Sequence, residues 1–537
     1  MGKIVKGSLF SLSYSTDLQS LITKNKLINM KRFFLIFFLV GVISMLQAQS
    51  LQKTALNIEK FKGAAGMRPN PATIQGLGSD EDNYYVFYSI VSLFGKFDAS
   101  FFVINKKLAN AKEYPLSKDK EDRFLWVQAT EEELVILLAR DKKGEQRTQI
   151  IKQGYAKTTG KLKKETVIAS FPKSKSEHWY FYSSTSPDKT KKGFLFMLAG
   201  KKNTVDSYYA TVLNQDYDVA WETTNDLEIS NESFNIEDIA ITNKGDMYVA
   251  FYSKPKDEKK SADKNSYIDL VYLTDGSKDK MNFRIDEKKS SGQILLKALK
   301  NNDVYLAGLF TVENPSKRDN NFTQKEFLSI KINGSNFNVS GSYTKKFEER
   351  YVKGRPNSVA NMGLINVLEL NNGDIAVLCE QSLFIIYTSN NTTIYTKIRG
   401  AVTTLFVKGE DASIDYVSVM DKTQSNKSNF DIPTKALHLS VFPFVYGNKV
   451  GYIFNDCLKR YTTPAKYKEH FFKSANGDDA SIVLNLQENG EKAEITPLTG
   501  RLPAKRLVRE ILFQENDRLV ILTRNRKEAH IEILTLP

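Results

Sequence analysis

The sequence predicts an all-β protein, a β-propeller of seven or eight antiparallel blades. Three observations support this fold class. Short polar turns recur along the 537 residues, and an apolar run follows each of them. A second apolar run often precedes the turn. Tyr and Phe, which favour strands, are abundant, with 25 and 33 copies. Two such runs joined by a short Asn, Asp or Gly turn form a β-hairpin, and the hairpin recurs roughly every 60 residues.

The individual strands can be placed from these runs. Eight runs that follow a turn begin at Tyr84, Leu134, Phe194, Met247, Val304, Ile375, Val450 and Leu519. Runs that precede a turn begin at Phe124, Phe234, Ile294, Ile365 and Arg509. Third strands are expected at Phe101, Gln149, Ile268, Phe327 and Ile531, and a fourth at Glu165. Each unit is therefore a meander of three or four strands, which buries both faces only by stacking on its neighbours.

Two other architectures fit the same strands less well. A linear β-solenoid has shorter and more uniform repeats, and two packed β domains would leave the regular recurrence unexplained. Closure of a ring also explains the ends of the pattern. The last repeat lacks a fourth strand, whereas "LQKTALNIEKF" from Leu51 is strand-like and has no repeat of its own. We expect this N-terminal segment to pair into the last blade and cover its open edge.

The N-terminal region has the order of a secretory signal. Lys31 and Arg32 precede an apolar stretch from Phe33 to Leu46, which is too short to span a membrane, and Ala48 is a small residue suited to cleavage. We expect residues 1–29 to be an over-extended start without structure, 30–48 to be the signal peptide, and 49–537 to be one propeller domain. The mature protein is then exported to the periplasm, outer surface or medium, without a transmembrane anchor. No Cys follows the apolar stretch to carry a lipid.

Charge and cysteine content restrict the partners. The net charge is +14, and removal of residues 1–48, which hold six basic residues and one acidic residue, lowers it to +9. A basic surface suits an anionic glycan or an acidic protein or peptide, although it can equally serve solubility. No nucleic-acid partner is expected, because no recognition helix, zinc finger or RNA-binding signature is present. We expect Cys379 and Cys457 to be buried free thiols, with a disulfide as the alternative.

The sequence contains no motif of an active site. The four His residues are isolated, and no zinc pair, serine elbow, calcium loop, phosphate-binding Gly loop or Asp box occurs. We therefore predict no catalytic residues, no metal and no cofactor. A glycosidase or polysaccharide lyase stays the alternative, because the fold can bring distant carboxylates together. Two acidic side chains converging at the central opening would favour the enzyme, whereas a basic or aromatic surface would favour a binding module.

Long connections give one candidate binding face. They span Ser253–Asn265, Thr311–Thr323 and Tyr343–Met362, and in a propeller connections of these types open on the same side. The last of them contains Arg350, Tyr351, Lys353 and Arg355, which we call the loop cluster. Cationic side chains beside an aromatic ring suit carboxylate-bearing glycans or acidic peptides. The alternative is an ordinary solvated loop.

Three segments resemble a known group of proteins. "NNGDIAVLCEQ" from Asn371, "SIDYVSVMDKTQ" from Ser413 and "VYGNKVGYIFND" from Val445 resemble uncharacterised exported β-propeller-like proteins of Gram-negative bacteria, mainly over residues 290–537. "STSPDKTKKGFLF" from Ser184 is also similar to the "SPDG" turn of Tol-type translocation propellers, with Lys189 in place of Gly. The resemblance implies the propeller fold and export but no activity. We expect a monomeric, secreted or periplasmic binding or scaffold protein.

Overall fold

The computed structural model is all β, with 34 strands and no helix among its described residues. None of these residues therefore forms a helix that could cross a membrane. The expected signal peptide lies outside the described residues. The structure describes residues 51–52, 73–91, 97–116, 122–142, 144–173, 180–199, 205–226, 233–254, 266–285, 289–312, 324–347, 362–389, 392–422, 424–428, 441–457, 472–473, 480–487, 494–497, 507–524 and 529–536.

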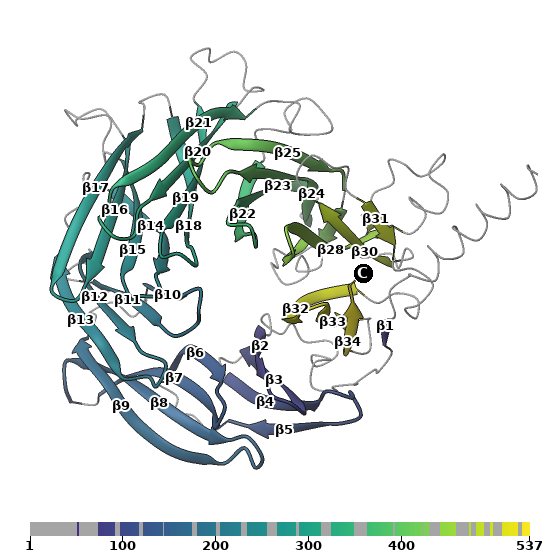
Figure 1. The fold of residues 1–537 in the computed structure, drawn as a ribbon. Helices are drawn as coiled ribbons and strands as arrows, with labels where there is room; N and C mark the ends of the chain where they lie inside the picture. The colour runs from purple at the N-terminus through teal and green to yellow at the C-terminus, as the bar shows by residue number, and fades with distance from the viewer. Residues whose placement is uncertain are drawn as a thin grey trace, which may run out of the picture.

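The strands form eight sheets arranged around a ring (Figure 1). We number these sheets as blades 1 to 8 in chain order. In each blade the first strand lies nearest the centre of the ring, and the following strands lie successively further out. This arrangement confirms the predicted propeller, and the described residues supply eight blades.

The first four blades each contain four antiparallel strands in chain order. Blade 1 contains β2 (Thr73–Ser79), β3 (Asn83–Val91), β4 (Phe97–Asn105) and β5 (Ala111–Pro115). Blade 2 contains β6 (Arg123–Ala129), β7 (Glu133–Asp141), β8 (Arg147–Ala156) and β9 (Leu162–Pro172). Blade 3 contains β10 (Tyr180–Thr185), β11 (Lys192–Ala199), β12 (Val205–Leu213) and β13 (Val219–Asp226). Blade 4 contains β14 (Ser233–Ile241), β15 (Met247–Lys254), β16 (Ser266–Thr274) and β17 (Ser277–Ile285).

Blade 5 repeats this pattern, whereas the last three blades are less uniform. Blade 5 contains β18 (Lys289–Ala298), β19 (Val304–Val312), β20 (Gln324–Ile332) and β21 (Val339–Phe347). Blade 6 contains β22 (Met362–Glu369), β23 (Ile375–Ser389), β24 (Thr392–Val407), β25 (Ile414–Met420), β26 (Gln424–Ser428) and β29 (Phe472–Lys473). Blade 7 contains β27 (Val441–Tyr446), β28 (Lys449–Cys457), β30 (Ala480–Gln487) and β31 (Glu494–Pro497). Blade 8 contains β32 (Leu507–Glu515), β33 (Arg518–Arg524), β34 (Ala529–Thr535) and β1 (Leu51–Gln52).

Alternation of side chains explains why the apolar runs are continuous. In β15, Met247, Val249 and Phe251 pack against blade 3, whereas Tyr248 and Ala250 between them pack against blade 5. A strand buried on both faces is apolar at every position. Eight such hydrophobic clusters occur, one between each pair of neighbouring blades around the ring. Each blade therefore buries both of its faces, as the repeat predicts.

The N-terminal segment closes the ring. β1 pairs antiparallel with β34, with Leu51 opposite Leu534 and Gln52 opposite Ile533. The predicted closing strand is thus confirmed for these two residues, and the rest of the segment quoted from Leu51 lies outside the described residues. The cluster between blades 8 and 1 completes the core at the same place. At the ring centre Gly76 of β2 allows close approach, because a Cβ there would lie 2.0 Å from the Leu512 carbonyl oxygen.

Short turns join first to second strands on one face, which we call the short-turn face. Side chains connect these turns from blade to blade. Asp188 N donates to Asn243 Oδ1 at 3.0 Å, Asn243 Nδ2 donates to the Lys300 carbonyl at 3.0 Å, and Lys300 N donates to Glu369 Oε2 at 3.0 Å. At the ring closure Lys106 Nζ pairs with Glu515 Oε1 at 3.1 Å. This face is therefore held by hydrogen bonds between blades 3 to 6 and by an ion pair between blades 8 and 1.

Blade 6 extends beyond the ordinary strand length. β23 has 15 residues and β24 has 16, and β26 pairs with β24 where β25 has ended. A buried ion network lies at the base of this extension. Lys422 Nζ and Arg399 Nη1 contact the fully buried Glu380 at 2.5 and 3.0 Å, and Lys422 also donates to Gln424 Oε1 at 2.9 Å. The network fixes the outer part of blade 6 to the ring.

Two further predictions concern cysteines and loops. Cys379 and Cys457 are buried and free, which confirms free thiols over the disulfide. The long connections begin slightly later than predicted. Ser253 belongs to β15 and Thr311 to β19, and Tyr343 lies in β21, whose pairing with β20 continues to Phe347 opposite Lys325. The remaining parts of these connections lie outside the described residues.

Candidate functional site

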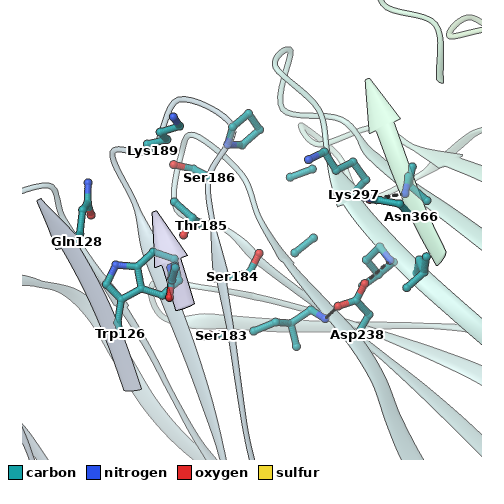
Figure 2. A pocket seen from close by; sticks show the side chains of 18 of the residues that line it. Trp126, Gln128, Ser183, Ser184, Thr185, Ser186, Lys189, Asp238, Lys297 and Asn366 are labelled. Atoms are coloured by element: carbon teal, nitrogen blue, oxygen red, sulfur yellow. Dashed lines mark hydrogen bonds between the residues drawn. The ribbon is translucent and has the colours of Figure 1, made fainter. Parts of the chain in front are cut away.

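A cavity of about 600 Å³ lies at the ring centre beside the short-turn face. Its wall comes from the first strands of blades 1 to 6 and from the turn Ser186–Lys189 of blade 3. Figure 2 shows Trp126, Gln128 and Thr185 on one wall and Asp238, Lys297 and Asn366 on the facing wall. A concave site with a few polar groups from separate elements is the usual form of a ligand pocket.

Bulges in the first strands place several of these side chains. The register shifts between Phe124 and Trp126, between Ile236 and Asp238, and between Leu364 and Asn366. A β-bulge reorients the side chains next to it and often occurs beside a functional site. The residue directly after each shift lines the cavity. The same local irregularity in three blades therefore supplies three of its polar or aromatic groups.

The carboxylates of β14 face the neighbouring inner strand. Asp238 accepts hydrogen bonds from Leu296 N at 2.8 Å and from Ile239 N at 2.9 Å. Glu237 accepts a backbone hydrogen bond from Ile294. Burial raises the pKa of both carboxyls, and the Asp238 charge further raises the pKa of Glu237. This pair of carboxylates connects blades 4 and 5, because it satisfies donors at the open inner edge of β18.

Lys297 is the cation of the same wall. Lys297 lies in β18, between β14, which carries Asp238, and β22, which carries Glu369. Its side chain is half-buried and within electrostatic reach of both carboxylates. Burial lowers the pKa of its amine, and these two carboxylates oppose that shift. No hydrogen bond or ion pair joins Lys297 Nζ to another described residue. Lys189, at the rim, is exposed and has φ +64°.

The facing wall carries two buried polar atoms without a partner. Trp126 Nε1 and Thr185 Oγ1 make no hydrogen bond to any described residue. Gln128 on the same wall accepts from Tyr217 OH at 3.3 Å. A buried donor or acceptor left unpaired destabilises the fold by about 1–3 kcal/mol, so such atoms call for a reason. Both atoms have almost no accessible surface, so a ligand in the cavity would reach them only after rotation of the Trp126 and Thr185 side chains.

Glu510 occupies the equivalent position in blade 8. It follows a register shift in β32, as Asp238 does in β14, and it is exposed to solvent. The surrounding protein nevertheless removes part of its hydration and raises the pKa to about 7. No charged partner contributes to that shift. Glu510 and the Glu237–Asp238 pair therefore belong to separate blades, and no electrostatic coupling links them.

Two features expected from the sequence distinguish the candidate functions, converging acidic side chains for an enzyme and a basic or aromatic surface for a binding module. The cavity region contains acidic, basic and aromatic residues. Asp238 lines the cavity and Glu237 precedes it in β14 without lining the cavity, and both already accept backbone hydrogen bonds. Trp126 and the two lysines form the aromatic and basic surface expected of a binding module. The loop cluster Arg350, Tyr351, Lys353 and Arg355 lies outside the described residues, and its role stays a prediction.

Sequence reasoning missed the cavity, although a signal was present. The lining residues interrupt apolar runs: Gln128 in "FLWVQAT", Asp238 in "FNIEDIAIT", Lys297 in "ILLKALK" and Asn366 in "INVLEL". A polar residue inside an otherwise buried strand needs a partner or a cavity. Each interruption lies in a different repeat, so no local motif joins them. The "SPDK" turn, selected for another reason, forms the cavity rim.

Comparisons with known proteins give similarity at low identity only. No protein-family model matches the chain, and no curated protein matches it. The β-propeller domain of the Trilobed protease from Pyrococcus furiosus is 10% identical with a TM-score of 0.35, covering 81% of this chain and 98% of that one.

Two further solved structures are similar at the same level. The polysaccharide lyase Uly1 is 9% identical with a TM-score of 0.34, covering 76% of this chain and 89% of that one. The Cps50 (Swd1) propeller domain from Myceliophteria thermophila is 10% identical with a TM-score of 0.31, covering 78% and 100%. The strand pairing of the chain itself defines it as a β-propeller.

Proposed function

We propose that the protein is an exported β-propeller binding module that holds a saccharide in the central cavity. The observation that carries the proposal is a cavity of about 600 Å³ whose wall combines the Trp126 indole with the Ser184 hydroxyl and the Gln128 amide side chain. A sugar has an apolar ring face and many hydroxyl groups. It therefore suits a wall that combines an indole with hydroxyl and amide side chains.

The rigidity of the rim supports the same proposal. The turns that surround the cavity are joined from Asp188 to Asn243 and from Lys300 to Glu369. A preformed site loses little conformational entropy on binding, and this favours a small ligand with few contacts. The cavity volume lies within the range of ligand pockets, about 300–1,000 Å³. A monosaccharide or disaccharide is the matching size.

A binding screen tests the proposal. The protein without residues 1–48 is heated with anionic and neutral disaccharides, and a bound ligand raises the melting temperature because it stabilises only the folded state. Trp126→Ala should abolish the shift, whereas Trp126→Phe should keep part of it and lose any ligand-induced fluorescence change. Tyr387→Ala, which removes an exposed aromatic from the β23 extension, is the matched control and should bind normally. Unchanged binding by Trp126→Ala would contradict the site.

Export is part of the proposal and has its own test. The basic Lys31 and Arg32, the apolar stretch and Ala48 support a cleaved signal. The intact mass of the exported protein should correspond to a chain that starts near Gln49. A mature product that retains Phe33–Leu46 would contradict export by this route and indicate an anchored protein.

A carbohydrate-active enzyme is the second candidate, and one observation favours it. Burial raises the pKa of Glu237, which precedes the cavity-lining Asp238 in β14, and a carboxyl with a raised pKa suits general-acid catalysis. Incubation with a bound oligosaccharide should then release shorter products, and Glu237→Gln should stop the release without preventing binding. Absence of products from every oligosaccharide that binds would leave the binding module as the function.

A further inference from the structure

We infer that the cavity recognises a saccharide bearing one carboxylate, a uronic acid, and that Lys297 is the residue that binds this group. The inference rests on the proposed function and deepens it. It begins from the charges of the cavity wall. The charged residues of the lining are Lys189, Lys297 and Asp238, two cations and one anion.

Asp238 is not available to compensate for either lysine by direct contact. Its two oxygens accept hydrogen bonds from Ile239 N and Leu296 N, at 2.9 and 2.8 Å. No ion pair joins it to Lys297 among the described residues. The carboxylate is thus used within the fold, and the ammonium group of Lys297 keeps three donors without a described acceptor.

The position of Lys297 makes an anion from outside the chain the fitting partner. Its side chain is half-buried, and a half-buried ammonium group has lost part of its hydration. A ligand carboxylate would replace those lost contacts by a charge-assisted hydrogen bond. Glu369 and Asp238 oppose a second negative charge nearby, because both lie within electrostatic reach of the same amine. One carboxylate therefore fits this wall better than a doubly charged phosphate.

The facing wall is also rich in donors. The Ser184 hydroxyl and the Gln128 amide line it beside the Trp126 ring, and both side chains can donate hydrogen bonds. Figure 2 shows Trp126 and Lys297 on opposite walls, with Ser184 and Thr185 between them in the view. A ligand that spans the cavity thus meets an ammonium group on one side and an indole and hydroxyl groups on the other. A uronic acid has a carboxylate at one end of its ring and hydroxyl oxygens at the other.

Matched pairs of disaccharides test the inference. Disaccharides that carry a single galacturonate, glucuronate or mannuronate residue are each compared with the neutral disaccharide of the same linkage and stereochemistry, by titration calorimetry. In at least one pair the acidic member should bind about 10- to 100-fold more tightly, the ratio that one hydrogen bond to a charged group gives. The ratio should fall as salt concentration rises.

Variants of Lys297 separate charge from shape. Lys297→Met keeps the aliphatic length and should remove the acid preference while leaving neutral binding unchanged, whereas Lys297→Arg should retain the preference. Lys300→Met, an exposed lysine on the adjacent turn outside the cavity, is the matched control and should behave as the parent. Urea unfolding of each variant verifies that the fold is intact, and Lys297→Gln, which is also neutral, serves if Lys297→Met is unstable.

The outcomes distinguish this inference from the proposed function. If the neutral member of every pair binds as tightly as the acid, or if Lys297→Met retains the preference, the carboxylate assignment is wrong although the cavity still binds saccharides. If no disaccharide of any pair binds, the proposed function fails as well. If inorganic phosphate competes as strongly as the uronate, the site recognises negative charge rather than a uronic acid, and the inference is overturned.

Discussion

Blades 3 to 5 and blades 6 to 8 are built on the same antiparallel repeat but differ in how regular their strands are. Blades 3 to 5 each contain four strands in chain order and connect their short turns by hydrogen bonds. Blades 6 to 8 contain an extended hairpin, a buried ion network and the ring closure. The cavity wall draws on blades 1 to 6 and on no described residue of blades 7 and 8. The candidate site is thus lined by the regular blades and by the first strand of blade 6, whereas blade 8 completes the ring.

One position shows the difference at the level of a residue. The sixth residue of the second strand is Tyr252 in blade 4, Leu309 in blade 5 and Glu380 in blade 6. Tyr252 and Leu309 lie in hydrophobic clusters between blades. Glu380 is instead buried with Lys422 and Arg399. Where a strand continues beyond the ring, no neighbouring blade offers an apolar face, and paired charges hold the extension instead.

The largest expected effect tests this contrast directly. Glu380→Ala leaves Lys422 buried without its counter-ion, so the free energy of unfolding should fall by about 3–5 kcal/mol. Urea unfolding measures the loss. The double variant Glu380→Leu/Lys422→Met replaces the pair by apolar side chains and should recover most of the stability, because removing both charges removes the uncompensated one. A double variant as unstable as Glu380→Ala would mean that the charges do more than hold the extension.

The ring closure should matter less than the buried network. Deletion of Leu51–Phe61 removes β1 and exposes the edge of β34, so stability should fall by about 1–3 kcal/mol through the lost backbone hydrogen bonds. Urea unfolding measures the change, and native mass spectrometry should show self-association through the open edge. An identical unfolding midpoint would show that β1 contributes nothing to closure.

A smaller effect should appear in the pH dependence of stability. Glu510 is exposed, but the surrounding protein removes part of its hydration and raises the folded-state pKa from the ordinary value of 4.5 to about 7. The fold therefore favours the neutral acid, and stability should decrease as pH rises from 4.5 to 7 and then level off. Glu510→Gln should remove this slope, with a melting temperature close to the parent at pH 5 and higher than the parent at pH 8. Parallel curves for the two proteins would contradict the raised pKa.

The smallest expected effect concerns the loop cluster. Replacement of Arg350, Lys353 and Arg355 by Ala should change stability by less than about 0.5 kcal/mol, as usual for exposed charges. The loop hypothesis expects anionic ligands to bind about 1–3 kcal/mol more weakly in this variant. The cavity proposal expects no change. Calorimetry with a uronate disaccharide on the triple variant and on Lys297→Met therefore decides between the two sites.

The fold was predictable because its signals are local. The run at Met247 marks the start of β15, and the run at Ile375 marks the start of β23, since an Asn and Gly turn precedes an apolar strand in both. The missing fourth strand of the last repeat likewise predicted closure by Leu51. Blade 6 was less accessible, because its strand lengths depend on a network that joins Glu380 to Lys422 across two strands.

The candidate site was not predictable because its signals are distant from one another in the sequence. Trp126, Asp238, Lys297 and Asn366 come from four repeats, and only the ring brings them together. The bulges that reorient Trp126, Asp238 and Asn366 consist of single extra residues, which the alternation of apolar and polar positions does not reveal. The charged loop attracted attention because its residues are adjacent in sequence. In a propeller, however, residues at the same register of successive repeats are the ones that meet.

The pairing of β1 with β34 also has a kinetic consequence. These two strands come from opposite ends of the described chain, so the last blade is complete only after the whole sequence between them is available to fold. Contacts between distant segments form slowly, and an incomplete blade exposes a strand edge in the meantime. Hydrogen exchange and proteolysis should therefore reach blade 8 before blades 3 to 5, and the lifetime of the folded ring depends on how often β1 detaches.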